Sequence, residues 1–254
     1  MIFNTESSLA KEPIQNAVDR ISEANKNFAG KITIEILEFS GENKNKILDA
    51  LDWSNLKSHI EGVMVTSSEE YADRLENSLK RIESDEALKF LAISDFGTLG
   101  IPGDDFNRSN HVFRLTRSAH VTDSSQKERD GSHGLGKGVF WKYSGISTVL
   151  FYSLTCHEDV QLATNDPVEQ KELLNKNKLD HRLIGQATLA NHKVDNVDYQ
   201  QTGFFGEAKN TEDGEAIISS WGQNDLIDLL GVGREEIKEN TGTTVLIMDY
   251  NDQA

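Results

Sequence analysis

A glycine-rich loop at residues 131–138, GSHGLGKG, could bind phosphate groups. Gly131, Gly136 and Lys137 have the G-x-x-x-x-G-K spacing of a P-loop, in which backbone N–H groups and a lysine surround phosphate oxygens. A P-loop places Ser or Thr next, as a magnesium ligand, whereas this chain has Gly138. The preceding residues, SSQKERD, also lack the pattern of the strand that leads into a P-loop. We therefore expect a glycine loop of another kind than a P-loop.

A carboxylate and an amide stand four residues apart near the start of the chain. Glu12 and Asn16 lie in SSLAKEPIQNAVDRISEANKNF, where apolar residues recur at helical spacing. Residues four apart share a face of a helix. A carboxylate there could activate a water molecule beside an amide oxygen that binds a hard metal ion such as Mg2+. The alternative is a surface glutamate beside a solvated asparagine, and the pair taken alone favours that alternative.

Asp95 follows the apolar run LKFLAI and begins the motif D-x-G-x-x-G, with Gly97 and Gly100. A carboxylate at the end of a buried strand can accept a hydrogen bond from an exocyclic amine in an apolar pocket. The two glycines would let the backbone approach a ring or a phosphate closely. An ordinary Asp-Gly turn is the alternative. A fourth motif, G-T-T with Thr243 and Thr244, opens the last apolar run of the chain.

Strands and helices must bring these distant motifs together. Alternating or apolar runs predict strands at residues 30–39, 88–93, 147–156, 183–189, 201–206 and in the closing TGTTVLIMDY. Helical spacing predicts helices near residues 7–28, 52–61, 68–83, 113–121, 139–143 and 224–230. The charged stretch at 157–178 is expected to be a surface insertion. Because strands and helices do not alternate strictly, we expect an α+β fold with a largely antiparallel sheet.

Taken in order, the four motifs resemble those of the GHKL superfamily of ATP-binding domains. Its members include the MutL mismatch-repair ATPases, type II topoisomerases, the ninety-kilodalton heat-shock chaperones, MORC proteins and histidine kinases. The resemblance covers nearly the whole chain, so residues 1–254 are expected to form one ATP-binding domain. It implies a two-layer α/β sandwich, with a mixed, mostly antiparallel sheet, helices on one face, and a lid at about residues 119–138. One departure is the extra residue between the glycines of DFGTLG, which leaves the roles of Thr98 and Leu99 open.

The resemblance also implies a role for each motif, with ATP and Mg2+ as cofactors. Glu12 would polarise the attacking water, and Asn16 would coordinate Mg2+, so the lid would need no Ser or Thr after its lysine. Asp95 would bind the adenine amino group. The other implied ATP-binding residues are Asp19, Gly97, Thr98, Gly100, Gly131, Ser132, His133, Gly134, Leu135, Gly136, Lys137, Thr243 and Thr244. For His133, an exposed loop histidine is the alternative.

The carboxylate at position 12 separates the function classes. Histidine-kinase relatives usually carry Asn there, so Glu12 favours transfer of a phosphoryl group to water and hence a hydrolase, an ATPase. In this family ATP orders the lid and joins two domains. We therefore expect slow hydrolysis, an ATP-dependent homodimer through the lid and the N-terminal region, and a downstream domain or partner protein that responds. The chain would then be the N-terminal domain of a longer protein.

Two alternatives remain open for this activity. One is a nucleotide-gated interaction module with negligible hydrolysis, and the other is phosphotransfer of the histidine-kinase type. Some bacterial GHKL proteins of unassigned role also have the second motif D-F-G-T and the lid G-S-x-G-x-G-K. Many of these resemble parts of antiphage defence or DNA-associated systems, which implies a role of that kind.

Composition narrows the function classes further. The 254 residues include 26 Lys and Arg against 42 Asp and Glu, a net charge of -16, so direct nucleic-acid binding through overall charge is not expected. Cys156 is the only cysteine, which rules out an internal disulfide, and its apolar neighbours predict a core residue. The chain has no signal-peptide pattern, and its most apolar window is interrupted by Lys142. We expect a cytoplasmic protein with no membrane partner.

Overall fold

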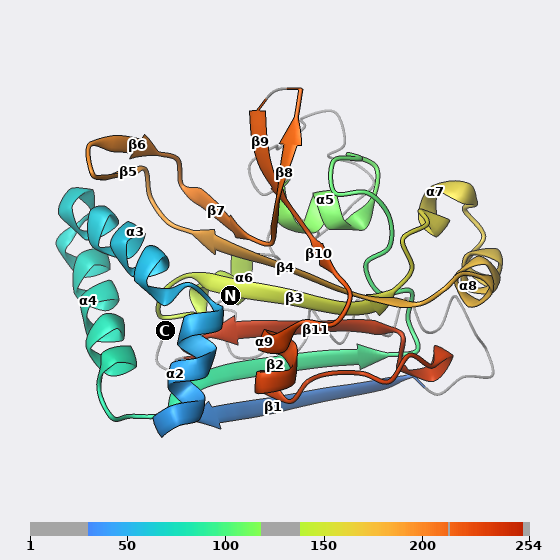
Figure 1. The fold of residues 1–254 in the computed structure, drawn as a ribbon, viewed down its shortest axis with the longest axis horizontal. Coiled ribbons are helices and arrows are strands. Elements are labelled where there is room, and N and C mark those ends of the chain that lie inside the picture. Colours follow the sequence, from blue (N-terminus) through green and yellow to red (C-terminus); the bar gives the residue numbers. More distant parts are fainter. Residues whose placement is uncertain (1–29, 118–137, 213, 251–254) are drawn as a thin grey trace, which may run out of the picture.

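The fold is built around one large β-sheet with helices packed against it (Figure 1). The computed structural model describes residues 30–117, 138–212 and 214–250. In chain order the described elements are β1 (Lys31–Phe39), α2 (Gly41–Ala50), α3 (Trp53–Thr66), α4 (Glu69–Glu83), β2 (Leu88–Phe96), α5 (His111–Thr116), α6 (Gly138–Lys142), β3 (Thr148–Thr155), α7 (Val160–Ala163), α8 (Pro167–Lys176), β4 (Asp180–Thr188), β5 (His192–Val194), β6 (Val197–Tyr199), β7 (Thr202–Phe205), β8 (Glu207–Thr211), β9 (Gly214–Ile218), β10 (Ser220–Trp221), α9 (Asp225–Leu230), a 3-10 turn (Lys238–Asn240) and β11 (Gly242–Met248).

Seven strands form the large sheet, in the order β1-β2-β11-β3-β4-β10, with β7 also paired to β4. Every pairing between described strands is antiparallel. The α+β class with a mostly antiparallel sheet is therefore confirmed. The last strand, β11, lies between β2 and β3, and Thr244 stands opposite Ser94. This register brings the G-T-T motif beside the strand end that carries Asp95.

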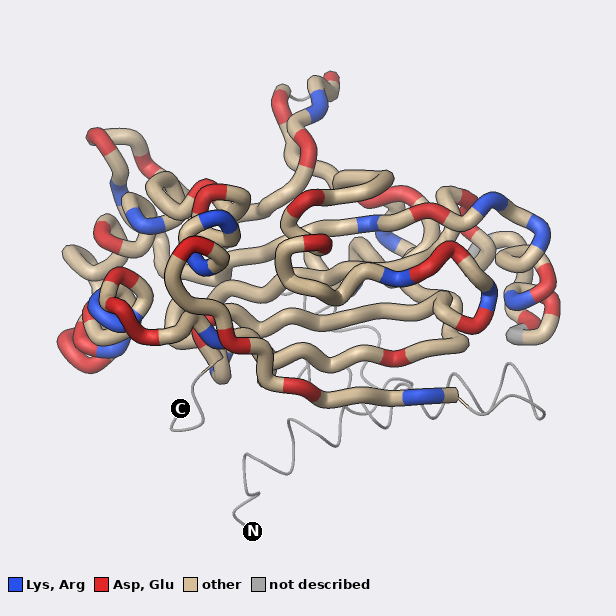
Figure 2. The backbone as a smooth tube through the Cα atoms, turned by 60° about the horizontal axis from the view of Figure 1, so that its bottom comes forward, with Lys and Arg blue, Asp and Glu red and all other residues tan. Residues whose placement is uncertain are grey.

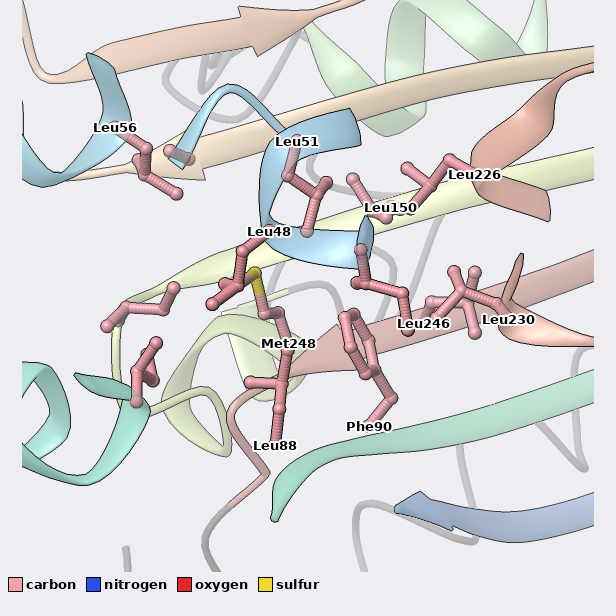
Figure 3. Close-up of a cluster of buried hydrophobic side chains, with 14 of the residues drawn as sticks. Leu48, Leu51, Leu56, Leu88, Phe90, Leu150, Leu226, Leu230, Leu246 and Met248 are labelled. Atoms are coloured by element: carbon pink, nitrogen blue, oxygen red, sulfur yellow. The ribbon is translucent and has the colours of Figure 1, made fainter. Parts of the chain in front are cut away.

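One face of the sheet carries the larger hydrophobic core. Phe90 of β2 and Leu246 and Met248 of β11 point to this face, where α2, α3, α4 and α9 pack against the sheet. Figure 3 shows Leu48 and Leu51 reaching from α2 toward these side chains. Each fully buried side chain of this size contributes about 1.5–3 kcal/mol of hydrophobic stabilisation.

A smaller core lies on the opposite face. Leu91, Ile93 and Ile247 pack there with Val112 of α5 and Phe140 of α6. The expectation of helices on one face only is therefore wrong, because α5 and α6 contact the second face. The physical reason is visible in β3, which is buried at all of its positions. Strands that are apolar on both sides require cover on both sides.

The strand expected at residues 30–39 is the edge strand β1. Its odd-numbered residues Leu37 and Phe39 pack against the larger core. The isoleucines on the other side are less covered, with Ile34 46% and Ile36 56% exposed within the described structure. The strand is therefore half-buried, with its core contacts made by the leucine and the phenylalanine.

Most of the expected helices are present with shifted ends. The helices expected at 68–83 and 224–230 are α4 and α9, which begin after Ser68 and Asn224. The helix expected at 52–61 is α3, and it continues to Thr66. The helix expected at 113–121 is α5, which begins and ends earlier, at His111 and Thr116. The helix predicted near residues 7–28 lies outside the described residues.

The stretch at 157–178 folds into two short helices, α7 and α8, that pack against the end of β3. Leu174 of α8 is fully buried beside Leu154 and Cys156, and Leu173 packs against this cluster. The insertion is thus charged on its outer side and apolar beneath. Cys156 is completely buried, and burial raises the pKa of its thiol to about 11. This confirms the prediction that the cysteine is a core residue.

The surface carries acidic and basic residues side by side, as Figure 2 shows along the helices and loops. The hairpin β8–β9 projects away from the sheet in both views, and its strand β8 is exposed at every position (Figures 1 and 2). Among the described helices, none combines the length and the apolar character that crossing a membrane requires.

Candidate functional site

Asp95 lies near the end of β2, on the face that carries the smaller core. It shares this face with Leu91 and Ile93, because alternate residues of a strand point the same way. Its Oδ1 accepts a hydrogen bond from the hydroxyl of Thr98 and another, at 3.2 Å, from the backbone N–H of Thr243. None of the described residues donates a hydrogen bond to its Oδ2. The half-buried carboxylate is thus fixed through one oxygen, while the other can accept from a ligand.

The turn after β2 requires glycine at two positions. Gly97 and Gly100 have φ angles of 81° and 69°, in the left-handed region that glycine adopts without strain. A Cβ on Gly100 would lie 2.3 Å from Oγ of Ser153, so the turn packs directly on β3. The extra residue between the glycines also has a place, because the side chain of Thr98 binds Asp95 and is 3% exposed.

The glycine of the G-T-T motif is a packing requirement of the same site. Gly242 has φ of 146°, and a Cβ there would lie 2.3 Å from the carbonyl oxygen of Asp95 and 2.7 Å from its Oδ1. Contacts this short do not occur between a Cβ and an oxygen, so any larger residue would displace Asp95. The motif therefore acts through its glycine as well as through its threonines.

The two threonines of this motif point to opposite faces of the sheet. Thr243 contributes its backbone N–H to Asp95 on the face of the smaller core. Thr244 is 1% exposed, and its hydroxyl oxygen lies 2.9 Å from Oγ of Ser94 and accepts from Arg234 at 2.8 Å. Thr243 therefore contacts the carboxylate of Asp95 through its backbone. The hydroxyl of Thr244 contacts Ser94 and Arg234 on the opposite face of the sheet.

Arg234, in the loop after α9, fixes the backbone at Asp95. Its Nη1 donates to the carbonyl oxygens of Asp95, at 2.8 Å, and Asn240, at 2.9 Å. Its guanidinium stacks over Phe96, 4.3 Å from the ring centroid, and the residue is 8% exposed. Burial lowers the pKa of this guanidinium, and the charge of Asp95 opposes that shift. The sequence analysis missed Arg234, because a single arginine in GVGREE carries no recognisable spacing.

Lys171 of α8 reaches the same turn from the insertion. Its Nζ donates to the carbonyl oxygen of Gly97 at 3.1 Å and to Oγ1 of Thr241 at 3.0 Å. Burial lowers the pKa of the amine to about 8, against the opposing effects of Glu239 and Asp95. The sequence analysis missed this residue too, because it is one of several lysines in a charged segment. The insertion is therefore a structural support of the candidate site.

The site residues named from the sequence fall into two groups. Asp95, Gly97, Thr98, Gly100, Thr243 and Thr244 are brought together by the pairing of β2 with β11. The others lie outside the described residues: Glu12, Asn16, Asp19, Gly131, Ser132, His133, Gly134, Leu135, Gly136 and Lys137. Within the described residues, no group of His, Cys, Asp and Glu is arranged to hold a metal ion.

What the described part of the site can do follows from its donors and acceptors. Oδ2 of Asp95, which accepts no hydrogen bond from the described residues, lies beside a turn whose backbone can be approached closely. Such an acceptor can receive a hydrogen bond from a neutral amine or from an amide N–H of a ring. Comparison with known proteins gave no match, whether to a family model, to a curated protein or to a solved structure.

Proposed function

We propose that the chain binds ATP at Asp95 in the manner of a GHKL domain and hydrolyses it slowly with Mg2+. The observation that carries the proposal is the geometry of the Asp95 carboxylate. Oδ1 is held by Thr98 and Thr243, and Oδ2 has no hydrogen-bond donor among the described residues. The exocyclic amine of adenine is a donor that suits this acceptor. The close packing of Gly100 and Gly242 keeps the carboxylate in place.

The surroundings of Asp95 support recognition of a base more than recognition of phosphate. Two cations at the turn, Lys171 and Arg234, donate hydrogen bonds to carbonyl and hydroxyl oxygens of the turn, of the loop before β11 and of β11. They hold the backbone and leave the carboxylate of Asp95 to the ligand. In the proposal, phosphate binding belongs to Gly134, Gly136 and Lys137, and the metal to Asn16.

Asn16 would hold Mg2+, which would supply positive charge that neutralises the phosphates. The side chain that would move a proton is Glu12, acting on a water molecule. Binding of ATP would favour a closed lid and a homodimer, and the change would pass to a downstream domain or a partner protein. The competing proposal keeps the ATP-dependent closure and dispenses with hydrolysis, so turnover is the property that distinguishes the two.

The substitution Asp95→Asn tests the base-recognition step with little change of shape. The amide oxygen can keep the bonds to Thr98 and to the N–H of Thr243, while the amide nitrogen replaces Oδ2 and turns an acceptor into a donor. Loss of a hydrogen bond to a charged group should weaken ATP binding about 10- to 100-fold. Inosine triphosphate presents an acceptor at the position of the adenine amine. The substitution should therefore weaken its binding less than that of ATP, or strengthen it. The exposed Asp73→Asn is the matched control.

Binding is measured by calorimetry with a non-hydrolysable ATP analogue and Mg2+, and turnover by phosphate release. Equal ATP affinity for the original chain and Asp95→Asn would overturn the proposed base site. If ATP binds and Glu12→Gln abolishes a measurable turnover, the ATPase proposal stands. If ATP binds and the original chain releases no phosphate, the interaction module replaces it.

A further inference from the structure

A cavity lies on the face of the sheet opposite to the face that carries Asp95. It has a volume of about 420 Å³ and is bounded by the junction of α2 and α3, by β4 and β7, and by the hairpin β5–β6. None of the described residues that are proposed for nucleotide binding lines it. Pockets for small molecules span roughly 300–1,000 Å³, so the cavity has room for a ligand of one or two rings.

The floor of this cavity is apolar. Leu51, which directly follows α2, lines it together with Leu150 of β3 and Leu226 of α9, and Figure 3 shows these three side chains near one another. Leu183 of β4 and Phe205 of β7 extend the apolar lining. A flat hydrophobic group could bury its surface here without leaving a polar group unpaired.

The hairpin β5–β6 forms the outer wall of the cavity and packs closely against α3. A Cβ on Gly62 of α3 would lie 2.4 Å from the carbonyl oxygen of Lys193, so the two backbones are in direct contact. Nδ1 of His59 lies 2.8 Å from Nε2 of His192, and Tyr199 packs edge-on against His59 with ring centroids 4.5 Å apart. Three aromatic rings, one from α3 and two from the hairpin, thus form one side of the cavity, and Gly62 allows the hairpin to approach the helix this closely.

The hydrogen bonds of the histidine pair determine which nitrogen is left for a ligand. Nδ1 of His192 lies 2.8 Å from the carbonyl oxygen of Ala190, which can only accept, so this nitrogen carries a proton. In neutral His192 the Nε2 atom is then an acceptor, and Nδ1 of His59 must donate to it. Burial and the neighbouring His192 lower the pKa of His59, which favours its neutral form. Its Nε2 is therefore an acceptor without a hydrogen-bond partner among the described residues.

The charge of the lining restricts the class of ligand. Among the described residues that line the cavity, none is a lysine or arginine, and Asp52 alone has a formally charged side chain. A phosphate or carboxylate would find no counter-charge and would face desolvation without compensation. The site therefore suits an uncharged molecule with a flat apolar body and a single polar edge.

We propose that this cavity is a binding site for a small, uncharged aromatic molecule that carries a hydroxyl or amine donor. The ring lies over Leu51, Leu150 and Leu226, and the donor bonds to Nε2 of His59. The proposal is independent of nucleotide binding at Asp95, because Asp95 and the cavity lie on opposite faces of the sheet and the two sites share none of the described residues.

The test uses fluoronaphthol and fluoronaphthalene, which are both uncharged at neutral pH and differ only in the hydroxyl donor. Fluorine NMR measures their affinities for the original chain, for His59→Phe and for the matched control His157→Phe, whose histidine lies outside the cavity. We expect fluoronaphthol to bind about 3- to 10-fold more tightly than fluoronaphthalene, as one neutral hydrogen bond allows. His59→Phe should remove this preference and His157→Phe should keep it.

A second measurement avoids the risk that His59→Phe loosens the hairpin. Nitrogen NMR of the original chain, labelled at histidine, reports directly on Nε2 of His59. Its resonance should move when fluoronaphthol is added and stay in place when fluoronaphthalene is added. The proposal would be overturned if neither probe bound. It would also be overturned if both probes bound with equal affinity and the His59 resonance did not move.

Discussion

Replacing Lys171 with methionine should change how the stability of the chain depends on pH. The amine of Lys171 is half-buried, and burial lowers its pKa from 10.5 to about 8. Below about pH 8 the amine is protonated in both the folded and the unfolded chain. Between about pH 8 and its unfolded pKa near 10.5, only the unfolded chain holds the proton. The free energy of unfolding of the original chain should therefore rise with pH across this window.

The size of the effect follows from the two pKa values. The difference between 10.5 and about 8 corresponds to about 3 kcal/mol of stability, of which about 2 kcal/mol should appear between about pH 7.5 and about pH 9.5. Water that reaches a half-buried amine screens part of this, so an observed change of about 1–2 kcal/mol is expected. The methionine side chain of the variant cannot titrate, so the stability of Lys171→Met lacks this contribution.

The assay is urea unfolding of the original chain, Lys171→Met and Lys176→Met at a series of pH values. Lys176 lies on the same helix with its side chain 72% exposed, so its replacement should leave the pH dependence unchanged. Other groups that titrate in this range are common to all three proteins and cancel in the differences. Parallel stability curves for the original chain and Lys171→Met would refute the claim that this amine is buried against the turn at Gly97.

Two further predictions concern packing and a buried ion pair. Gly242→Ala should lower the free energy of unfolding, measured by thermal unfolding, by about 1–3 kcal/mol, because Gly242 has φ of 146° and a Cβ there would meet Asp95. The control Gly203→Ala has open space around its Cβ and should change the free energy of unfolding by less than about 1 kcal/mol. Arg182→Met should cost about 3–5 kcal/mol in urea unfolding, because it leaves Asp105 buried without its 2.8 Å partner, and a loss as small as that for exposed Lys46→Met would contradict this account.

The sequence was sufficient to predict the central strands and the antiparallel sheet. The apolar runs of β2, β3 and β11 are too long and too apolar for any place but the middle of a sheet. It did not reveal α2, whose segment GENKNKILDA has a polar start. The structure supplies the reason: Lys44 is 4% exposed, and its amine donates to the carbonyl oxygens of Ser84 and Glu86, both at 2.8 Å. A lysine that serves as a core residue is not distinguishable from a surface lysine by pattern.

In the candidate site, too, some residues could be predicted from the sequence and others could not. Asp95, Gly97 and Gly100 were recognisable because they are adjacent in the sequence and glycine has few substitutes in a left-handed turn. The side chains that support them come from elsewhere in the chain, Lys171 from an insertion and Arg234 from a loop, and neither belongs to a motif. Their contribution depends on tertiary packing, which single-residue patterns do not encode.

The contacts around the turn after β2 also bear on how a ligand would bind there. The N–H of Gly97 donates to the carbonyl oxygen of Thr241 at 2.7 Å, its own carbonyl oxygen accepts from Lys171, and the carbonyl oxygen of Asp95 accepts from Arg234. Two segments far from Asp95 in the sequence, one at Lys171 and the other at residues 234–241, therefore hold the backbone on both sides of the carboxylate. A carboxylate fixed in this way loses little conformational entropy when a donor binds to it. Weakening one of these three hydrogen bonds should therefore lower the affinity of a ligand that binds Oδ2, although none of the three contacts the ligand. The entropic cost of ordering Asp95 would then count against the binding free energy and no longer against the folding free energy.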